Sequence, residues 1–264
     1  MRTFKLFLLT LALSLQGFCP ISAKALKGER QEKYKEENFN LNQIAITARD
    51  GSCRNCEASR EAIDMFDIRV ESLPQECQNL AIARNCAEIT ACTKRSGYYN
   101  VTVLVEGYPK SYLVECDAHT EGGGWTVIQR RQDGSVDFYR TWDNYKNGFG
   151  NIEGEFFIGL DRLYALTNFN GPQELLILME GINQTAGNAV VFAYAKYSSF
   201  AIGNESEKYA LKQTGNYSGT AGDSLRYHVG CKFTTKDQDN DSDPDGNCAV
   251  LRSGAWWYKN CYDR

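Results

Sequence analysis

The stretch of sequence that decides the fold occupies residues 116–167 and reads CDAHTEGGGWTVIQRRQDGSVDFYRTWDNYKNGFGNIEGEFFIGLDRLYALT. It combines dense glycines and frequent aromatic residues with a short β-type run at 125–130 and a short helical stretch at 160–167. The glycine triplet at 122–124 allows close backbone approach and a positive φ just before a strand. Large apolar side chains of the kind that build a core follow the triplet, at Trp125, Trp142, Phe149, Phe156 and Phe157.

Further β-type runs flank this stretch, at residues 98–105, 175–179 and 189–194. Because helical stretches are fewer, the pattern predicts an α+β domain with antiparallel pairing. The whole chain has 264 residues, of which 42% are hydrophobic and 23% charged, as is typical of a globular protein. Its formal charge of -4 argues against a nucleic-acid-binding protein, which needs a basic face.

The first residues predict secretion. Arg2 and Lys5 precede an apolar run at 6–15, and small residues follow, so residues 1–23 are expected to be a signal peptide. The run is too short to span a membrane, and we therefore expect a secreted, extracellular protein without a membrane span. Residues 24–80 form a polar leader in which 24–50 is expected to be disordered or a frayed helix, while 57–70 could form one amphipathic helix.

Five Asn-x-Ser/Thr sequons fit an extracellular glycoprotein. Four of them are predicted to carry glycans on surface loops: Asn100, Asn183, Asn204 and Asn216. The fifth, at Asn240, is the least favourable because it lies inside an acidic loop.

Four motifs downstream carry a resemblance: YSGTAGDSL at 217–225, KFTTKDQDND at 232–241, NCAV at 247–250 and GAWWYKNC at 254–261. Together with residues 116–167, they closely resemble the fibrinogen C-terminal domain, which fibrinogen chains, ficolins, tachylectins, angiopoietins and tenascins share. The resemblance covers residues 84–264. It implies an α+β fold with a central antiparallel sheet, short helices and a loop-rich, calcium-binding C-terminal subdomain. Full domains of this family continue past the position of Arg264 to a closing strand of the central sheet, so the domain is expected to be truncated.

Nine cysteines remain after removal of the signal peptide, and an odd number leaves at least one without a partner in the same chain. The resemblance implies two disulfides, Cys86–Cys116 and Cys248–Cys261. Cys92 and Cys231 have no standard counterpart in the family, and we predict that they bond to each other. The remaining three are Cys53, Cys56 and Cys77. Since three cysteines cannot all pair within one chain, a disulfide-linked homo-oligomer is a live hypothesis.

The acidic loop contains the best signal for a site. Asp237, Asp239, Asp241, Asp243 and Asp245 alternate along the chain, and alternating oxygen ligands suit a hard cation. An EF-hand register fails because Arg252 stands where a bidentate Glu is needed. The resemblance implies calcium, with the side chains of Asp239 and Asp241 and the backbone carbonyls of Asp243 and Asp245 as ligands. A solvated acidic turn is the alternative interpretation.

The resemblance also implies a ligand pocket, because acetyl-binding members place one beside the loop between Cys248 and Cys261. The candidate binding residues are Arg252, Ala255, Trp256, Trp257, Tyr258, Asn260, Cys261 and Tyr262. Two of them depart from the family, since Arg252 replaces a Tyr and Tyr262 replaces a His.

An enzymatic function is not expected. Residues 222–225 spell the GDSL string of some esterases, with His228 nearby, but no histidine follows His228 to complete a triad. The sequence also contains no phosphate loop, GxGxxG or HExxH motif.

These observations predict a secreted, calcium-dependent recognition protein of lectin type. It would bind acetylated glycans or surface carbohydrates, as in innate immunity. The alternative is an extracellular protein ligand or matrix or signalling factor of the angiopoietin or tenascin type, which binds a protein receptor and no sugar. The departures at Arg252 and Tyr262 favour this alternative.

Overall fold

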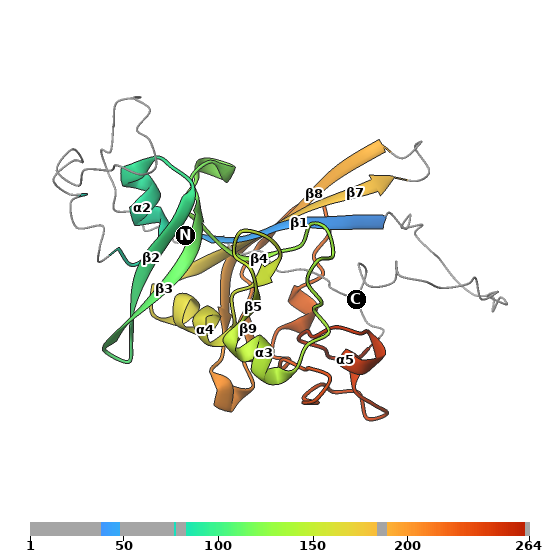
Figure 1. Cartoon of the computed structure of the whole chain (residues 1–264). Coiled ribbons are helices and arrows are strands. Elements are labelled where there is room, and N and C mark those ends of the chain that lie inside the picture. The colour runs from blue at the N-terminus through green and yellow to red at the C-terminus, as the bar shows by residue number, and fades with distance from the viewer. Residues whose placement is uncertain (1–37, 48–76, 78–82, 184–188, 262–264) are drawn as a thin grey trace.

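The computed structural model describes residues 38–47, 77, 83–183 and 189–261 of the chain (Figure 1). The strands form one antiparallel sheet in the order β10-β8-β7-β1-β4-β3-β2, while β9 pairs with β8, β6 with β4 and β5 with β6. The strands are β1 (Asn38–Thr47), β2 (Gly97–Val105), β3 (Tyr108–Asp117), β4 (Trp125–Arg130), β5 (Phe149–Gly150), β6 (Phe156–Phe157), β7 (Gln173–Asn183), β8 (Ala189–Ile202), β9 (Leu211–Gln213) and β10 (Tyr217–Gly219).

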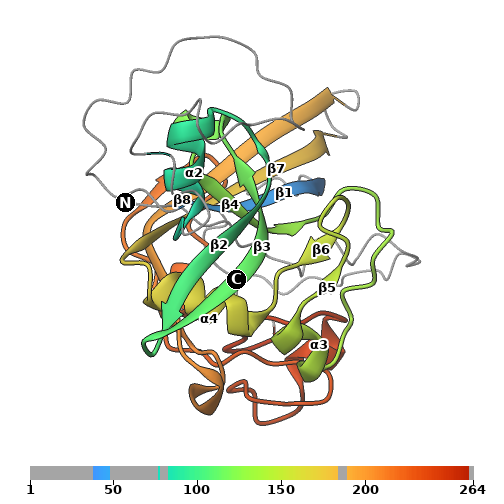
Figure 2. The same ribbon diagram turned by 60° about the vertical axis from the view of Figure 1, so that its left-hand side comes forward.

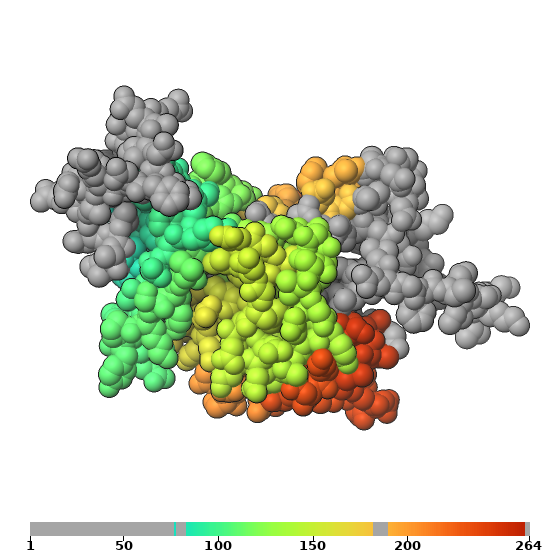
Figure 3. Space-filling model, viewed as in Figure 1, coloured from blue at the N-terminus to red at the C-terminus, as the bar shows by residue number. Residues whose placement is uncertain are grey.

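The helices are short. They are α2 (Cys86–Thr93), α3 (Trp142–Asn147), α4 (Leu160–Asn168) and α5 (Cys248–Leu251), with 3-10 turns η5 (Thr120–Gly122), η7 (Glu205–Glu207) and η8 (Arg226–His228). In the view of Figure 1, α3, α4 and α5 lie below the sheet, and the turned view of Figure 2 shows the β2–β3 hairpin crossing beside α4. The residues after β10 form a C-terminal subdomain, which adjoins the α3 region on the surface in Figure 3.

The α+β fold predicted from the sequence is confirmed. The β-type runs lie within β2, β4, β7 and β8, and the helical stretch lies within α4. Along α4, Leu160, Leu163 and Leu166 recur at three-residue spacing and are buried, as expected for a helix that covers a sheet with one face. Of the aromatic residues expected in the core, Phe149 is partly buried and the others are buried.

Glu155 fixes the loop that precedes α3. Its carboxylate is buried and accepts hydrogen bonds from the backbone N–H groups of Gln132 at 2.6 Å, Gly134 at 3.1 Å and Val136 at 3.0 Å. Burial alone would favour the neutral acid, but these N–H groups hold the pKa of Glu155 below its ordinary value. The ionised carboxylate therefore anchors the loop to β6.

One element of the leader corrects the sequence prediction. We expected residues 24–50 to be disordered or a frayed helix, yet Asn38–Thr47 form β1. Ile44 is aligned with Gln129 of β4 on one side and with Ile177 of β7 on the other, so β1 is an interior strand. The run IAIT at 44–47, in which three of four residues are β-branched, suits this environment, but it is short and lies among polar residues. The signal peptide and the helix expected at 57–70 lie outside the described residues.

Both disulfides that the resemblance implies are present, whereas the third predicted disulfide is not. The structure contains both Cys86–Cys116 and Cys248–Cys261, but it joins Cys92 to Cys77. The predicted Cys92–Cys231 bond is therefore wrong. The physical reason is position: Cys92 lies on α2, whereas the Cys231 carbonyl accepts a hydrogen bond from Leu211 of β9. Cys231 is a free, half-buried thiol. Cys77 is bonded to Cys92 and cannot form an interchain disulfide. Of the three cysteines considered for such a bond, Cys53 and Cys56 remain, and both lie outside the described residues.

The position of β1 can be tested with proline. Ile46 is aligned with Thr126 of β4 and Leu175 of β7, so Ile46→Pro removes an N–H from the interior of the sheet, and we expect a loss of at least about 2 kcal/mol in the free energy of unfolding. Urea unfolding of the secreted protein measures this loss. Asn38→Pro is the matched control, since proline is tolerated at the first residue of a strand. Equal stability of the two variants would show that β1 does not lie within the sheet.

The revised disulfide assignment gives a second prediction. The Cys77–Cys92 bond closes a loop with a sequence separation of 15 residues. Cys92→Ser should therefore lower the free energy of unfolding by up to about 3 kcal/mol, because the unfolded chain regains the freedom that the bond removes. Cys231→Ser, the control, should change it by well under half as much. If Cys231→Ser and Cys92→Ser lowered the free energy of unfolding by the same large amount, the result would support the Cys92–Cys231 disulfide instead.

Candidate calcium and ligand site

Asp237 connects the acidic loop to α3. Its Oδ1 accepts hydrogen bonds from the backbone N–H of Trp142, at 2.8 Å, and from the Thr235 hydroxyl, also at 2.8 Å. Trp142 is the first residue of α3, where a carboxylate satisfies a free N–H group and interacts favourably with the helix dipole. Asp237 therefore has a structural role, and the cation candidates begin with the next aspartate.

The following aspartates form a series of tight turns. Asp239 accepts a hydrogen bond from the N–H of Asp241 at 3.3 Å, Asp241 from Asp243 at 2.9 Å, and Asp243 from Asp245 at 3.0 Å. Aspartate favours such turns because its short side chain reaches the backbone two residues on. The other oxygen of Asp241 accepts from the N–H of Cys248 at 2.9 Å, which draws the loop against the start of α5.

Asp239 and Asp241 lie close enough to influence each other. Burial raises the pKa of Asp241 above its ordinary value, and the neighbouring Asp239 carboxylate adds to this effect, although N–H groups of Cys248 and Asp243 act in the opposite direction. Two adjacent carboxylates repel unless a positive charge neutralises them. This pair is the electrostatic centre of the candidate cation site.

The loop offers oxygen atoms that fit a hard cation. Asp243 Oδ2 lies 2.9 Å from Cys261 Sγ, so this side chain faces the disulfide. In the described chain, no hydrogen bond reaches the carbonyl of Asp243 or of Asp245. Two carboxylates and two open carbonyls match the set that the resemblance implies.

Within the described residues, the one group of three acidic or sulfur ligands closer than 4.8 Å is Asp243, Cys248 and Cys261. It is not a metal site, because its two sulfur atoms are bonded to each other.

Most of the predicted pocket residues are part of the core. Ala255, Trp256, Trp257 and Tyr258 are buried, and Cys261 is buried in its disulfide. The Trp257 indole donates to the Tyr209 carbonyl at 2.6 Å, and the Tyr258 hydroxyl donates to the Gly254 carbonyl at 2.9 Å. These aromatic side chains shape the subdomain from inside.

Two of the remaining candidates lie nearer the surface. Asn260 is exposed, whereas Arg252 is partly exposed and donates from Nε to the Cys261 carbonyl at 2.6 Å. Arg252 thus links the beginning of the segment between Cys248 and Cys261 to its end. Tyr262 lies outside the described residues.

Sequence reasoning missed a group of side chains beside Trp256. The Lys259 ammonium lies over the Tyr227 ring, 4.6 Å from its centre, and the buried His228 ring packs edge-on against both Tyr227 and Trp256. The Trp256 indole N–H is buried and has no hydrogen-bond acceptor among the described residues. A cationic and aromatic boundary of this kind is suited to binding, and its pieces are too far apart in sequence to form a motif.

The GDSL string is a structural turn. Asp223 forms an ion pair with Arg226 at 3.0 Å, and the Leu225 N–H donates to the Tyr197 hydroxyl at 3.2 Å. Asp223 is therefore paired with Arg226, and the His228 ring packs against Trp256.

The glycosylation candidates differ in their surroundings. Asn100 and Asn216 are exposed, and the side chain of Asn183 is outside the described part. Asn204 is half-buried and caps η7 with its side-chain oxygen. The Asn240 side chain donates to the Phe233 carbonyl at 2.8 Å, which agrees with its low ranking as a glycan acceptor.

The α+β fold and this loop-rich subdomain are those of a class of non-enzymatic binding domains. Residues 82–264 match the sequence profile of the C-terminal globular domain of fibrinogen beta and gamma chains, and the chain belongs to this family. Domains of the family commonly bind calcium. A disulfide-rich domain of this type indicates an extracellular location. None of the helices in the described part is long and apolar enough to cross a membrane.

Two curated relatives illustrate the match. Fibrinogen C domain-containing protein 1 of Homo sapiens is 43% identical over 195 residues, which cover 72% of this chain and 40% of the relative. Ryncolin-4 of Cerberus rynchops is 44% identical over 181 residues, which cover 68% of this chain and 49% of the relative. The chain therefore spans less than half the length of these relatives.

Solved structures show the same fold. The fibrinogen-like globe domain of human ANGPTL2 is 42% identical, with a TM-score of 0.59, and the match covers 67% of this chain and 77% of that domain. A lamprey fibrin D-dimer in complex with the peptide Gly-His-Arg-Pro-amide is 27% identical, with a TM-score of 0.57, over 77% of this chain and 63% of that one.

Proposed function

We propose that this protein is a secreted, calcium-dependent recognition protein of lectin type that binds acetylated glycans or other surface carbohydrates. The observation that carries the proposal is the Asp239–Asp241 pair, held against α5 beside the disulfide of the candidate pocket. Membership of a family of binding proteins supports the class of function.

Calcium would stabilise the acidic loop and would not take part in a chemical reaction. Asp239 and Asp241, with the carbonyls of Asp243 and Asp245, would hold the ion and lose their mutual repulsion. The Ser242 N–H between these ligands donates to the Lys259 carbonyl at 3.1 Å. An ordered acidic loop would therefore fix Lys259 and the adjoining Asn260 at the edge of the candidate pocket.

A second candidate function is that of an extracellular ligand or matrix factor that binds a protein receptor and no sugar. The observation that favours it is the contact of Arg252 with the Cys261 carbonyl, where acetyl-binding members of the family have a Tyr. Covalent homo-oligomers linked through Cys53 or Cys56 fit either function, because multivalent display raises avidity for repeated ligands.

Calcium binding can be tested by thermal stability. At 100 times its dissociation constant, calcium should add about 2.7 kcal/mol to the stability of the folded protein and raise its Tm, with reversal by EDTA. Asp239→Asn removes one charge but keeps the acceptor for the Asp241 N–H, so it should abolish most of this shift. Asp245→Asn is the matched control from the same loop, because it retains the backbone carbonyl and should keep most of the shift. The reverse pattern would mean that the ligands are assigned in the wrong register.

Carbohydrate binding can be tested on a resin that carries N-acetylglucosamine. We expect the protein to be retained in calcium and released by EDTA or by free N-acetylglucosamine, while glucose, which has no acetyl group, releases little. Asp239→Asn should flow through, and Asp143→Asn, an exposed change outside the loop, should be retained. Flow-through of wild-type protein that calcium stabilises would exclude the sugar hypothesis and favour a protein receptor.

A further inference from the structure

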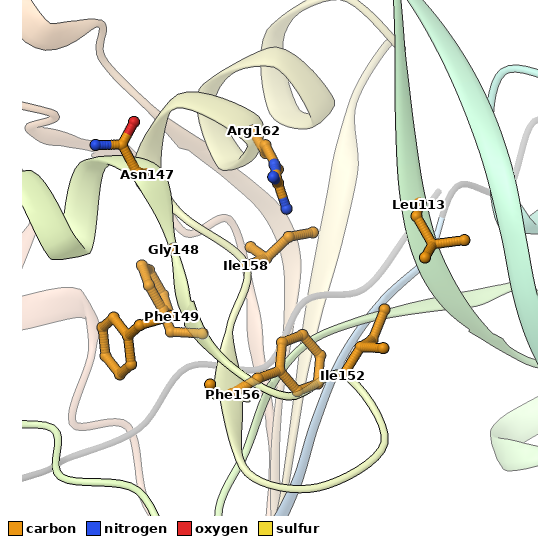
Figure 4. Close-up of a pocket in the computed structure, with 10 residues that line it drawn as sticks. Leu113, Asn147, Gly148, Phe149, Ile152, Phe156, Ile158 and Arg162 are labelled. Atoms are coloured by element: carbon orange, nitrogen blue, oxygen red, sulfur yellow. The ribbon is translucent and has the colours of Figure 1, made fainter.

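A second pocket lies away from the acidic loop (Figure 4). It has a volume of about 220 Å³ and lies between β3, the segment from α3 to β6, and α4. Asn147 and Gly148, at the C-terminal end of α3, line it, whereas Asp237 binds the N-terminal end of the same helix. The acidic loop and this pocket therefore adjoin opposite ends of α3.

A closely packed group of aromatic side chains lies beneath the pocket. Phe149 packs edge-on against Tyr145 with ring centres 5.0 Å apart, and it lies 5.9 Å from Phe157. Phe156, Phe157 and Ile158 are nearly fully buried. The backbone is closely packed as well, because a Cβ on Gly150 would lie 2.2 Å from the Glu155 carbonyl oxygen and only glycine fits there. This shape exists before any ligand arrives.

The mouth of the pocket carries one charge. Among the lining residues of the described chain, Arg162 alone is charged, and Figure 4 shows its side chain extending from α4 towards Ile158. Leu113 reaches towards the same space from β3 and is 50% exposed. The rim thus combines a cation with exposed apolar surface.

The Arg162 guanidinium is available to an anion. It has no ion pair or hydrogen bond within the described chain, and its neighbour Asp161 accepts a hydrogen bond from the Tyr209 hydroxyl. Arg130 also approaches this region, since it lies 5.7 Å from the centre of the Phe156 ring, but it is paired with Glu115. The positive charge that remains at the pocket therefore belongs to Arg162.

We propose that this pocket binds a small carboxylate with an apolar body. An apolar cavity of roughly 150 Å³ holds a benzene ring, so 220 Å³ accommodates a ring with a short chain. The ring would lie against the exposed or partly exposed side chains of Leu113, Phe149 and Ile152, and the carboxylate would bind the planar guanidinium through charge-assisted hydrogen bonds. The acid is either a free small molecule or the C-terminus of a peptide that ends in an aromatic residue. This site is independent of calcium and of the proposed sugar site.

The experiment is a titration of the full, secreted, isotope-labelled chain, followed through the NMR amide signals of Gly148 and Gly150. The probe is 3-phenylpropionate, with 3-phenyl-1-propanol as the neutral compound of matched shape. We expect saturable shifts with a dissociation constant on the order of 1 mM for the acid, and weaker binding of the alcohol. Arg162→Met keeps the apolar stem of the exposed side chain and should weaken binding of the acid roughly tenfold or more. It should leave the binding of the alcohol and the Tm unchanged.

Arg226→Met, at an exposed arginine on η8, is the matched control and should bind like the wild type. A second probe pair, N-acetyl-glycyl-phenylalanine and its C-terminal amide, distinguishes the two sources. Binding of the peptide acid but not of the amide identifies a peptide terminus, whereas binding of 3-phenylpropionate alone identifies a free acid. The proposal is overturned if neither acid gives saturable shifts up to roughly 20 mM, or if Arg162→Met binds the acid as the wild type does.

Discussion

The C-terminal subdomain depends on the burial of one side chain, Trp257. Its indole is completely buried and donates its N–H to the Tyr209 carbonyl, between the sheet and the loops. Its ring packs edge-on against Phe200 of β8 and against Phe233 and Trp256 of the loops. Burial of an aromatic surface of this size contributes several kcal/mol, which short loops cannot obtain from their own hydrogen bonds. The acidic loop and the disulfide loop are thereby held in place on a rigid sheet.

This arrangement explains how loops can support a site without regular structure. Asp239, Asp241 and Asp243 each accept a hydrogen bond from the backbone N–H two residues ahead, so the chain folds tightly and the carboxylates of Asp239 and Asp241 lie close together. Two effects oppose each other in this loop, because the hydrogen bonds of the turns stabilise it while the carboxylates that they bring together repel one another. The Cys248–Cys261 disulfide and the contact of Arg252 with Cys261 hold its far side. A cation would relieve the remaining repulsion without any change in the fold.

The sequence predicts the parts of this structure that depend on local pattern. Runs such as 125–130 become strands because their β-type residues suit a buried sheet, and the alternating aspartates mark the acidic loop. The leader strand β1 was missed because its pairing with β4 and β7 depends on strands that are more than 70 residues away in sequence. The Cys92–Cys231 prediction failed for the same reason, since relative position in space decides between cysteines of similar chemistry. The pocket at Arg162 has no sequence signature, because its lining comes from three separate segments.

Helix α3 connects the two candidate sites, and its anchoring decides whether they can influence each other. Asp237 holds its first residue, while Lys146 and the Trp142 indole both bind Glu205 of η7. Gly148 follows the last residue of the helix, and its N–H donates a hydrogen bond to the Asn144 carbonyl at 2.8 Å. These contacts favour one position of this six-residue helix. Coupling between sites requires an element with two arrangements, and none of these contacts provides a second arrangement of α3. The acidic loop and the Arg162 pocket are therefore expected to act as independent binding sites on one rigid scaffold.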